Sequence, residues 1–258
     1  IVNCQRGGPG LGTIQPSQGD YFQACKGGGH GDYRLIVLAP ASVQEMHDFV
    51  ALGFDLAFKY RNPAMILADG AIGQMMEKVV LAPQRPRKTN EEIAAECRDW
   101  ATYGKPADRP RNVVTSLELQ SEAMEKINLR LQAKYKAMEE NEVRYEALAC
   151  DDADYVIVAF GSSARICSAT VEMARAEGIR LGMLRPITLY PFPTRPIAEL
   201  AARVKGFLSV ELNAGQMVED VRLAVNGAVP VEHYGRQGGM IYSPDEVLAA
   251  LKEKLIKA

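Results

Sequence analysis

The chain has 258 residues, of which 47% are hydrophobic and 24% charged, and its formal net charge is -2. This length is sufficient for two ordinary domains with separate cores. Because there is no basic excess to neutralise phosphates, nucleic acid is not an expected partner. No apolar stretch approaches the ~20 residues needed to cross a bilayer, and nothing resembles a secretory leader. We therefore expect a cytoplasmic protein with no membrane partner.

The chain begins with an arginine surrounded by glycines, in the stretch IVNCQRGGPGLGT. Ile1 and Val2 are typical of the end of a buried strand, and because the chain opens inside this run we expect residues to precede Ile1. The glycines after Arg6 allow positive φ angles and a close approach of a ligand to the backbone. An arginine at a strand exit can present its planar fork to a carboxylate or a phosphate. The alternative is a tight turn with the arginine in solvent.

A βαβ unit is predicted next. Residues 34–39 and 64–68 are short apolar runs of the kind that form buried parallel strands. The segment between them has apolar residues at helical spacing, with Ser42 available as an N-cap. Asp69 follows the second strand, where it could meet a ligand or cap the next helix. His30, in a glycine-rich loop, could face a ligand or be an ordinary surface residue.

The middle of the chain reads as a connector followed by a helix. Residues 80–112 are rich in proline and polar side chains, which is typical of a surface segment between domains. Residues 117–148 carry an apolar stripe among many Glu, Lys and Arg residues. This pattern predicts a long charged helix with a solvated face. The alternative is a helix that packs on a partner subunit.

The last third alternates strand and helix patterns. Apolar runs predict strands at 154–160, 180–186, 206–212 and 230–234, and the segments that follow them predict helices at 162–178, 194–205, 214–226 and 243–257. Gly178 is placed to end the first helix, and Ser243 with Pro244 to begin the last one. This order predicts a parallel sheet covered by helices. The GSS at 161–163 could hold an anion or only cap its helix.

Several familiar motifs are absent from the sequence. There is no P-loop, no G-x-G-x-x-G fingerprint and no nucleophile elbow. The histidines lie far apart, and no cysteines are arranged as C-x-x-C, so we expect no metal site in this chain. If the protein takes part in electron transfer, the metal must therefore lie on another chain. The five cysteines are Cys4, Cys25, Cys97, Cys150 and Cys167.

The segment QRGGPGLGTIQPSQGDYFQACKGGGHGDYRLIVLAPASVQEM resembles the alpha subunits of 2-oxoacid:ferredoxin oxidoreductases, and especially the branched-chain (2-oxoisovalerate) type. The similarity continues through LADGAIGQMME, LRPITLYPFP, VELNAGQMVEDVR and YGRQGG. The resemblance implies an α/β fold with a truncated thiamine pyrimidine-binding-type domain and a parallel α/β domain similar to the transketolase C-terminal domain. The corresponding division is 1–82 for the first domain, 83–150 for a linker with the charged helix, and 151–258 for the second domain.

The resemblance also implies an activity and a set of partners. Such enzymes decarboxylate a 2-oxoacid on thiamine diphosphate, pass electrons through iron–sulfur clusters to ferredoxin, and transfer the acyl group to coenzyme A. The pyrophosphate and Mg²⁺ site is expected on a beta subunit and the clusters on other subunits. The expected protein partners are therefore beta and gamma subunits, with a delta subunit as a further option, and ferredoxin.

Within this family the arginine of the R-G-G-P segment meets the substrate carboxylate, and Arg6 is the matching residue. Gly7, Gly8, Gly12 and Thr13 are expected to shape that wall of the pocket, and an apolar Leu11 is compatible with a branched aliphatic oxoacid. The family's Y-P-I-T-P segment and its thiamine-protonating glutamate do not lie in these residues. We therefore expect no catalytic residue in this chain, and no cofactor-binding residue is assigned.

Two other functions fit the same sequence. A non-catalytic scaffold would use the two α/β domains and the charged helix only to organise partner subunits. An independent nucleotide-binding protein is the weaker alternative, since the fingerprints are missing. We expect the region from about Asp151 onward to be structural and interfacial. Within it, Arg185 and Arg236 are placed in loops at or beyond strand ends, where they could contact another subunit or coenzyme A or simply lie at the surface.

Overall fold

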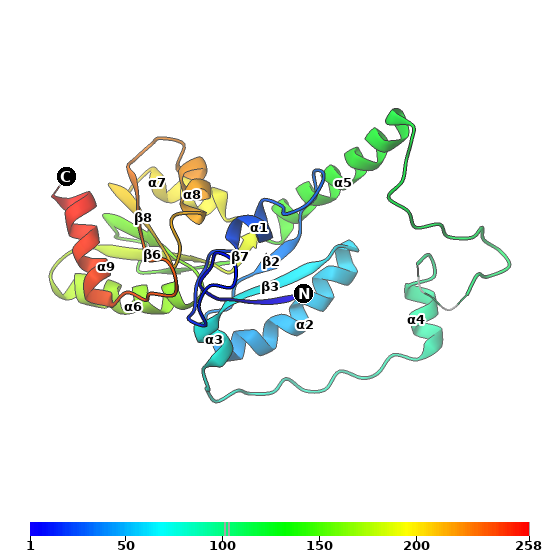
Figure 1. Ribbon diagram of the computed structural model, residues 1–258, viewed down its shortest axis with the longest axis horizontal. Coiled ribbons are helices and arrows are strands. Elements are labelled where there is room, and N and C mark those ends of the chain that lie inside the picture. Colours follow the sequence, from blue (N-terminus) through cyan, green and yellow to red (C-terminus); the bar gives the residue numbers. More distant parts are fainter. Residues whose placement is uncertain (101, 103, 258) are drawn as a thin grey trace. The chain divides into compact units, whose positions relative to one another are not determined.

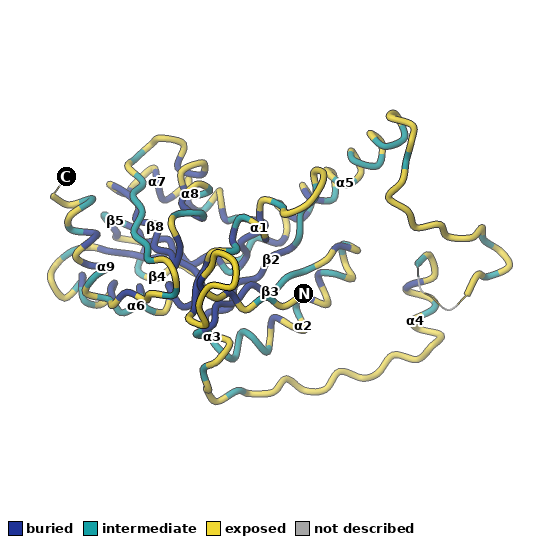
Figure 2. Tube along the Cα trace, viewed as in Figure 1, coloured by how far each residue is buried: buried dark blue, intermediate teal, exposed yellow. Residues whose placement is uncertain are grey.

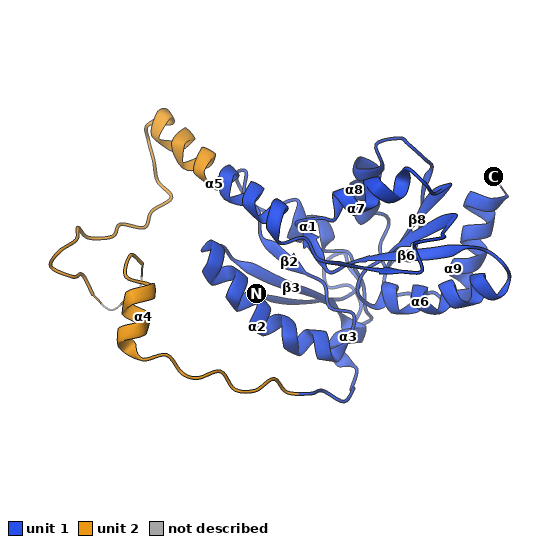
Figure 3. Ribbon diagram, turned by 180° about the vertical axis from the view of Figure 1, so that it is seen from behind, with its two compact units in different colours: residues 1–80, 132–258 blue, residues 81–131 orange. Residues whose placement is uncertain are grey.

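The structure is a computed structural model that describes residues 1–100, 102 and 104–257 (Figure 1). It divides into two compact units, of which the first contains residues 1–80 and 132–258 and the second residues 81–131 (Figure 3). We call residues 1–80 and 132–258 the N-terminal and C-terminal parts of the first unit. Among the described residues, no helix is both long and apolar enough to cross a membrane.

The N-terminal part is built on a four-stranded sheet in the order β1-β3-β2-β7, whose last strand is contributed by the C-terminal part. The strands β1 (Val2–Gln5), β3 (Ala64–Asp69) and β2 (Ile36–Leu38) are parallel, and β7 (Thr188–Tyr190) pairs antiparallel with β2. The predicted βαβ unit is confirmed: α2 (Val43–Tyr60) connects β2 to β3, and the Ser42 side chain accepts a hydrogen bond from the Glu45 N–H. A short helix, α1 (Tyr21–Cys25), precedes β2.

The prediction of a buried strand end at Ile1 and Val2 is wrong. Their exposed fractions are 67% and 57%, because β1 is the edge strand of its sheet and pairs on one side only. The apolar residues therefore predicted a strand correctly, but they did not indicate whether that strand pairs with other strands on one side or on both.

The C-terminal part is built on a five-stranded sheet in the order β4-β6-β5-β8-β9. The four predicted parallel strands are confirmed as β5 (Tyr155–Val158), β6 (Leu181–Pro186), β8 (Gly206–Glu211) and β9 (Val231–Gly235). The helices between and after them are α6 (Gly161–Ala176), α7 (Thr194–Ala201), α8 (Met217–Val225) and α9 (Pro244–Leu251), with a π turn at Lys252–Ile256.

The sheet has a core on each face, as Figure 2 shows by the buried strands between its helices. Val156 and Phe207 pack with side chains of α7 and α8, whereas Ile157 and Leu208 pack with side chains of α6 and α9. Successive residues of a strand point to opposite faces, so a strand buried on both faces reads as a continuous apolar run. This is why the sequence revealed these strands clearly.

The long charged helix is shorter than predicted. It is α5 (Ser121–Asn141), and Tyr145–Leu148 forms β4, which pairs antiparallel with β6 at the edge of the sheet. Within α5, only Tyr135 and Met138 are buried. Most of the helix surface is therefore solvated, which agrees with the prediction. The connector contains one described helix, α4 (Asn90–Glu96), which begins with a capping box at Thr89. The predicted division at residues 82 and 150 stays a prediction.

Candidate functional site

The glycine-rich segment after β1 folds back on itself, and we call residues 6–16 the Arg6 loop. Arg6 forms a bridge with Pro16, the Gly7 N–H donates to the Gln15 carbonyl at 2.9 Å, and the Thr13 N–H donates to the Gly7 carbonyl at 2.7 Å. Gly12 has a φ of +56°, and a Cβ there would lie 1.8 Å from the Gly7 oxygen. Only glycine fits this position, so the loop's shape depends on it.

The guanidinium of Arg6 is exposed and is turned towards its own loop. Its Nη1 donates to the carbonyl oxygens of Leu11 and, at 3.4 Å, of Thr13. Among the described residues it forms no ion pair with an acidic side chain. The positive charge therefore meets only neutral acceptors, although all five predicted site residues, Arg6, Gly7, Gly8, Gly12 and Thr13, lie in this one loop.

A turn of the C-terminal part contacts the Arg6 loop, and we call Gly238 and Gly239 the glycine turn. The Thr13 hydroxyl donates to the Gly238 carbonyl at 3.2 Å. A Cβ on Gly239 would lie 2.4 Å from the Cβ of Gln15, and one on Gly7 would lie 2.8 Å from the Gly239 nitrogen. The two backbones are thus closer than side chains would permit, which explains why glycines occur on both sides.

Gln18 attaches the end of this segment to the C-terminal part. Its buried side chain donates to the Phe160 carbonyl at 2.8 Å and accepts from the Ser163 hydroxyl at 2.7 Å and from the Leu212 N–H at 3.0 Å. The backbone of Gln18 adds two further bonds, to the Leu212 carbonyl and from the Asn213 side chain. Every polar atom of this amide is therefore occupied within the chain.

Asp69 caps two helices at once. One carboxylate oxygen accepts from the N–H groups of Ala71 and Ile72, and the other accepts from the Ser162 N–H at 3.0 Å and the Ser162 hydroxyl at 2.7 Å. The first pair confirms capping of the next helix, α3 (Gly70–Gln74). The second shows that the anion at the start of α6 is this carboxylate, which favours the structural alternative for the GSS segment.

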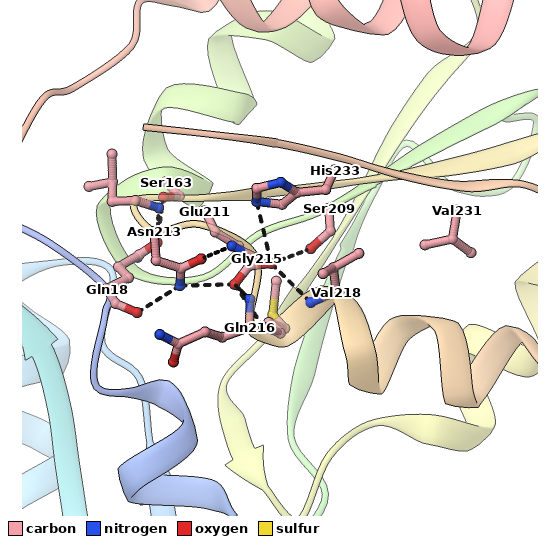
Figure 4. Close-up of polar contacts among 12 residues, drawn as sticks. Gln18, Ser163, Ser209, Glu211, Asn213, Gly215, Gln216, Val218, Val231 and His233 are labelled. Carbon is pink, nitrogen blue, oxygen red and sulfur yellow. Dashed lines mark hydrogen bonds and ion pairs between the residues drawn. The ribbon is translucent and has the colours of Figure 1, made fainter. Parts of the chain in front are cut away.

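Glu211 is fully buried at the start of α8 (Figure 4). It accepts from three backbone N–H groups at 2.7 to 3.1 Å and from two side chains at 3.0 Å, and these donors belong to Gln216, Met217, Val218, Ser209 and Asn213. Five donors, together with the helix N-terminus, compensate for the burial of its charge. This carboxylate therefore fixes the VELNAGQM turn, whose Leu212 and Asn213 bind Gln18.

His233 lies on β9 with its Nε2 4.0 Å from Glu211 Oε1. Burial lowers the pKa of His233, and the Glu211 carboxylate opposes that shift. The Nε2 atom is buried and has no hydrogen-bond partner among the described residues. Figure 4 shows the ring joined to Glu211 by this ion-pair contact alone.

Other candidates do not join this region. His30 is exposed in its loop. Arg185 lies within β6 and is buried against Glu45 and Glu146, and Arg236 pairs with Glu246 at 2.7 Å. The idea that Arg185 sits in a loop and reaches another molecule is therefore wrong, because its charge is already neutralised.

The described residues form neither a metal site nor a complete thiamine site. They hold no cluster of three or more His, Cys, Asp or Glu side chains placed to bind a metal ion. The buried polar side chains beside the Arg6 loop, Gln18, Asp69 and Glu211, are satisfied by this chain's own groups. These residues therefore do not by themselves form a thiamine site, and we assign none of them to the cofactor.

Sequence reasoning missed Gln18 and the glycine turn as partners of the Arg6 loop. Both lie in segments that carried the resemblance, PSQGD and YGRQGG, but their contacts join residues more than 140 positions apart. Four of the five matching segments meet at the base of the Arg6 loop. Only LRPITLYPFP contributes elsewhere, through β6 and β7.

Comparison with known proteins places this geometry in a family. Residues 1–145 match the thiamine diphosphate-binding domain of pyruvate flavodoxin/ferredoxin oxidoreductases, and residues 153–247 match core domain II of pyruvate:ferredoxin oxidoreductase. The ketoisovalerate oxidoreductase subunit VorB of Methanothermobacter thermautotrophicus is 49% identical over 98% of this chain and 70% of its own length. The 2-oxoglutarate synthase subunit KorA of Methanothermobacter marburgensis is 36% identical over 96% of this chain and 71% of its own length.

Two solved structures share the fold. A 2-oxoglutarate:ferredoxin oxidoreductase from Magnetococcus marinus, solved with 2-oxoglutarate, coenzyme A and succinyl-CoA, aligns with a TM-score of 0.79 at 23% identity. The alignment covers 98% of this chain, which spans only 48% of that one. A split-gene transketolase in an inactive tetramer aligns with a TM-score of 0.50 at 14% identity. That alignment covers 86% of this chain and 57% of the transketolase chain. The predicted α/β class is confirmed, and the chain belongs to the alpha subunits of the 2-oxoacid:ferredoxin oxidoreductases.

Proposed function

We propose that this chain supplies the substrate-carboxylate-binding wall of a thiamine-dependent 2-oxoacid:ferredoxin oxidoreductase, and that Arg6 binds the carboxylate. The observation that carries the proposal is an exposed guanidinium whose only hydrogen-bond partners among the residues that the structure describes are two carbonyls of its own loop. A carboxylate that replaced those carbonyls would form a charge-assisted pair, which is stronger than a bond to a neutral acceptor. Gly7, Gly8, Gly12 and Thr13 hold the loop in a shape that leaves the guanidinium accessible.

The oxoacid we propose is 2-oxoisovalerate. Arg6 is the one cationic residue in the Arg6 loop, so the loop offers a single charge to a single carboxylate. Leu11 and Ile14 are 83% and 78% exposed, which gives apolar surface beside that charge. A monocarboxylate with a branched aliphatic chain suits this surface better than a dicarboxylate. Two VorB subunits named for ketoisovalerate, at 49% and 47% identity, support the same choice.

The remaining parts of the reaction are proposed to lie on other chains. Thiamine diphosphate with Mg²⁺ would be held at its pyrophosphate end by a beta subunit, and iron–sulfur clusters on other subunits would carry electrons to ferredoxin. Coenzyme A would accept the acyl group. Since the relatives are themselves called subunits, we expect beta and gamma subunits, and in some assemblies a delta subunit. The isolated chain should not reduce ferredoxin, and turnover by it alone would contradict the proposal.

The test is substitution of Arg6 in the full assembled enzyme. Losing a charged pair in a closed site costs about 2–4 kcal/mol, so Arg6→Ala should lower kcat/KM for the 2-oxoacid by about 30- to 900-fold. Arg6→Lys should also be damaging, because the two-pronged fork is lost. Arg195→Ala is the control, since this arginine is 90% exposed and pairs only with Glu199 one helical turn away. Unchanged kinetics for Arg6→Ala would remove Arg6 from the mechanism.

The alternative is a non-catalytic scaffold. The buried network of Gln18, Asp69 and Glu211 favours it in one respect, because these polar groups act only within the chain. Isothermal titration of the assembled enzyme with a non-reacting 2-oxoacid analogue separates the two functions. A scaffold requires equal affinity in wild type and Arg6→Ala, whereas a substrate wall requires weaker binding in the variant.

A further inference from the structure

We infer that the glycine turn, Gly238 with Gly239, is a positioning element that sets the conformation of the Arg6 loop for substrate binding. The inference rests on the proposed function of Arg6. It assigns a role in substrate binding to the C-terminal part, which the sequence indicated to be structural and interfacial.

The contact between the two segments is specific at both ends of the loop. Gly7, directly after Arg6, packs on the glycine turn, and a Cβ at Gly7 would lie 2.7 Å from the Gly238 carbonyl carbon. Thr13, which closes the loop through its N–H bond to Gly7, donates its hydroxyl to the Gly238 carbonyl at 3.2 Å. The turn therefore contacts the residue after Arg6 and also a residue whose carbonyl accepts from the guanidinium.

The glycine turn is itself anchored. The Gln237 side chain donates to the Asn213 carbonyl at 3.3 Å, and Asn213 is bound both to Glu211 and to Gln18. Hydrogen bonds thus connect the buried Glu211 carboxylate, through Asn213, to Gln237, the residue directly before the turn. The Arg6 loop is held on one side by this turn, and the same Asn213 binds Gln18, two residues after the loop ends. A loop with two such anchors is pre-organised, which lowers the entropy cost of binding.

Gly238 and Gly239 form a matched pair for the test. Both have positive φ, +67° and +92°, so alanine strains the backbone at either position. A Cβ on Gly238 meets no heavy atom within 4 Å, whereas one on Gly239 would lie 2.4 Å from the Gln15 Cβ and 2.8 Å from the Thr13 hydroxyl oxygen. Only Gly239→Ala therefore pushes on the Arg6 loop, and Gly238→Ala controls for the strain.

The kinetic experiment uses the assembled enzyme with 2-oxoisovalerate as the variable substrate. Displacing a substrate-binding group by about 1 Å can cost up to a hundredfold in rate. We expect Gly239→Ala to raise the KM for the oxoacid at least about tenfold over Gly238→Ala. The KM values for coenzyme A and ferredoxin should not differ between the two variants. Equal oxoacid KM values for the two would overturn the inference.

Hydrogen exchange gives a readout that does not depend on catalysis. The amides of Gly7 and Thr13 are bonded within the loop, so a peptide covering residues 7–15 should exchange faster in Gly239→Ala than in Gly238→Ala. Unchanged exchange there would show that the turn does not hold the loop. Because this measurement is independent of Arg6 chemistry, it separates failure of the inference from failure of the proposed function, which Arg6→Ala tests.

A second pair of variants serves if Gly239→Ala does not assemble. Thr13→Val keeps the shape of the side chain but removes the hydroxyl, which donates to the Gly238 carbonyl and accepts from the Gln15 N–H at 3.3 Å, and Thr13→Ser keeps both bonds. Faster exchange and a higher oxoacid KM in Thr13→Val, restored in Thr13→Ser, would support the inference. If Thr13→Val behaves like wild type in both measurements, the inference fails.

Discussion

Arg6 and Arg185 are both arginines that the sequence places at strands of this subunit, and their surroundings are opposite. Arg185 has a side chain that is 5% exposed, with two nitrogens 2.6 and 2.8 Å from the Glu45 carboxylate and its Nε 2.9 Å from Glu146. Arg6 is exposed and, within the described part of the chain, its guanidinium donates only to two carbonyls. An arginine that is paired with carboxylates of its own chain has a structural role. An arginine without such a pair can bind an anion from outside the chain.

The Arg185 cluster also joins the two parts of the first unit. Glu45 lies in the first turn of α2, where it also accepts from the Ala41 N–H at 2.7 Å, and Arg185 lies near the end of β6, beside the edge strand β4 of the five-stranded sheet. Burying a guanidinium is costly unless its partners are well placed. Here the two terminal nitrogens of Arg185 meet the Glu45 carboxylate in a bidentate pair, whereas the buried Nε lies 2.9 Å from a Glu146 oxygen without forming a hydrogen bond among the described residues.

The largest effect is expected from removing the buried charge. Arg185→Met should lower the free energy of unfolding by about 3 kcal/mol, because Glu45 would lose its partner at a poorly hydrated position. Urea denaturation of the purified chain measures this, with Arg195→Met as the control at a surface arginine. A loss no greater than that of the control would mean that the cluster contributes nothing to stability.

Next in size is the change at Glu45. Glu45→Gln keeps the shape of the side chain but removes its charge and one acceptor oxygen, so the bidentate ion pair becomes at most a single hydrogen bond from the charged guanidinium to a neutral amide oxygen. We expect a loss of about 2 kcal/mol. In the double variant Glu45→Gln with Arg185→Met the two losses should not add, since both remove one interaction. Additive losses would argue against direct coupling.

The sequence predicted local features of this molecule well and distant ones poorly. The buried strands were found because both of their faces are apolar. Ser42 and Ser243 were placed as caps, and capping was one of the two roles given to Asp69, because a cap lies within a few residues of the groups it binds. β4 was missed, since Tyr145–Leu148 is an edge strand with every residue exposed and it follows a charged helix closely.

The partners of Arg185 and of the Arg6 loop could not be predicted in the same way. Glu45 and Arg185 are 140 positions apart, and Thr13 and Gly238 are 225 apart. No periodicity or spacing rule connects such residues, because the fold alone brings them together. The five predicted site residues were grouped correctly only because they are neighbours in the chain; their role in binding stays a prediction.

A smaller effect is expected at the exposed end of the Arg185 cluster. The side chain of Glu146 is 62% exposed, so water and salt screen its attraction to Arg185. Glu146→Gln should therefore cost about 0.5 kcal/mol or less in the same urea titration. A loss as large as that of Glu45→Gln would show that burial does not set the strength of these pairs.

The smallest effect on stability is expected at Arg6, although the largest effect on substrate binding is proposed there. Arg6→Ala removes hydrogen bonds from an exposed side chain to carbonyls that water can satisfy, so the free energy of unfolding should change by no more than about 0.5 kcal/mol. Together with a high KM for the oxoacid in the same variant, this result would show that Arg6 acts in substrate binding and Arg185 in stability. If Arg6→Ala instead unfolds as easily as Arg185→Met, the Arg6 guanidinium is a structural clamp of its own loop, and weakened substrate binding by that variant would no longer indicate a carboxylate contact.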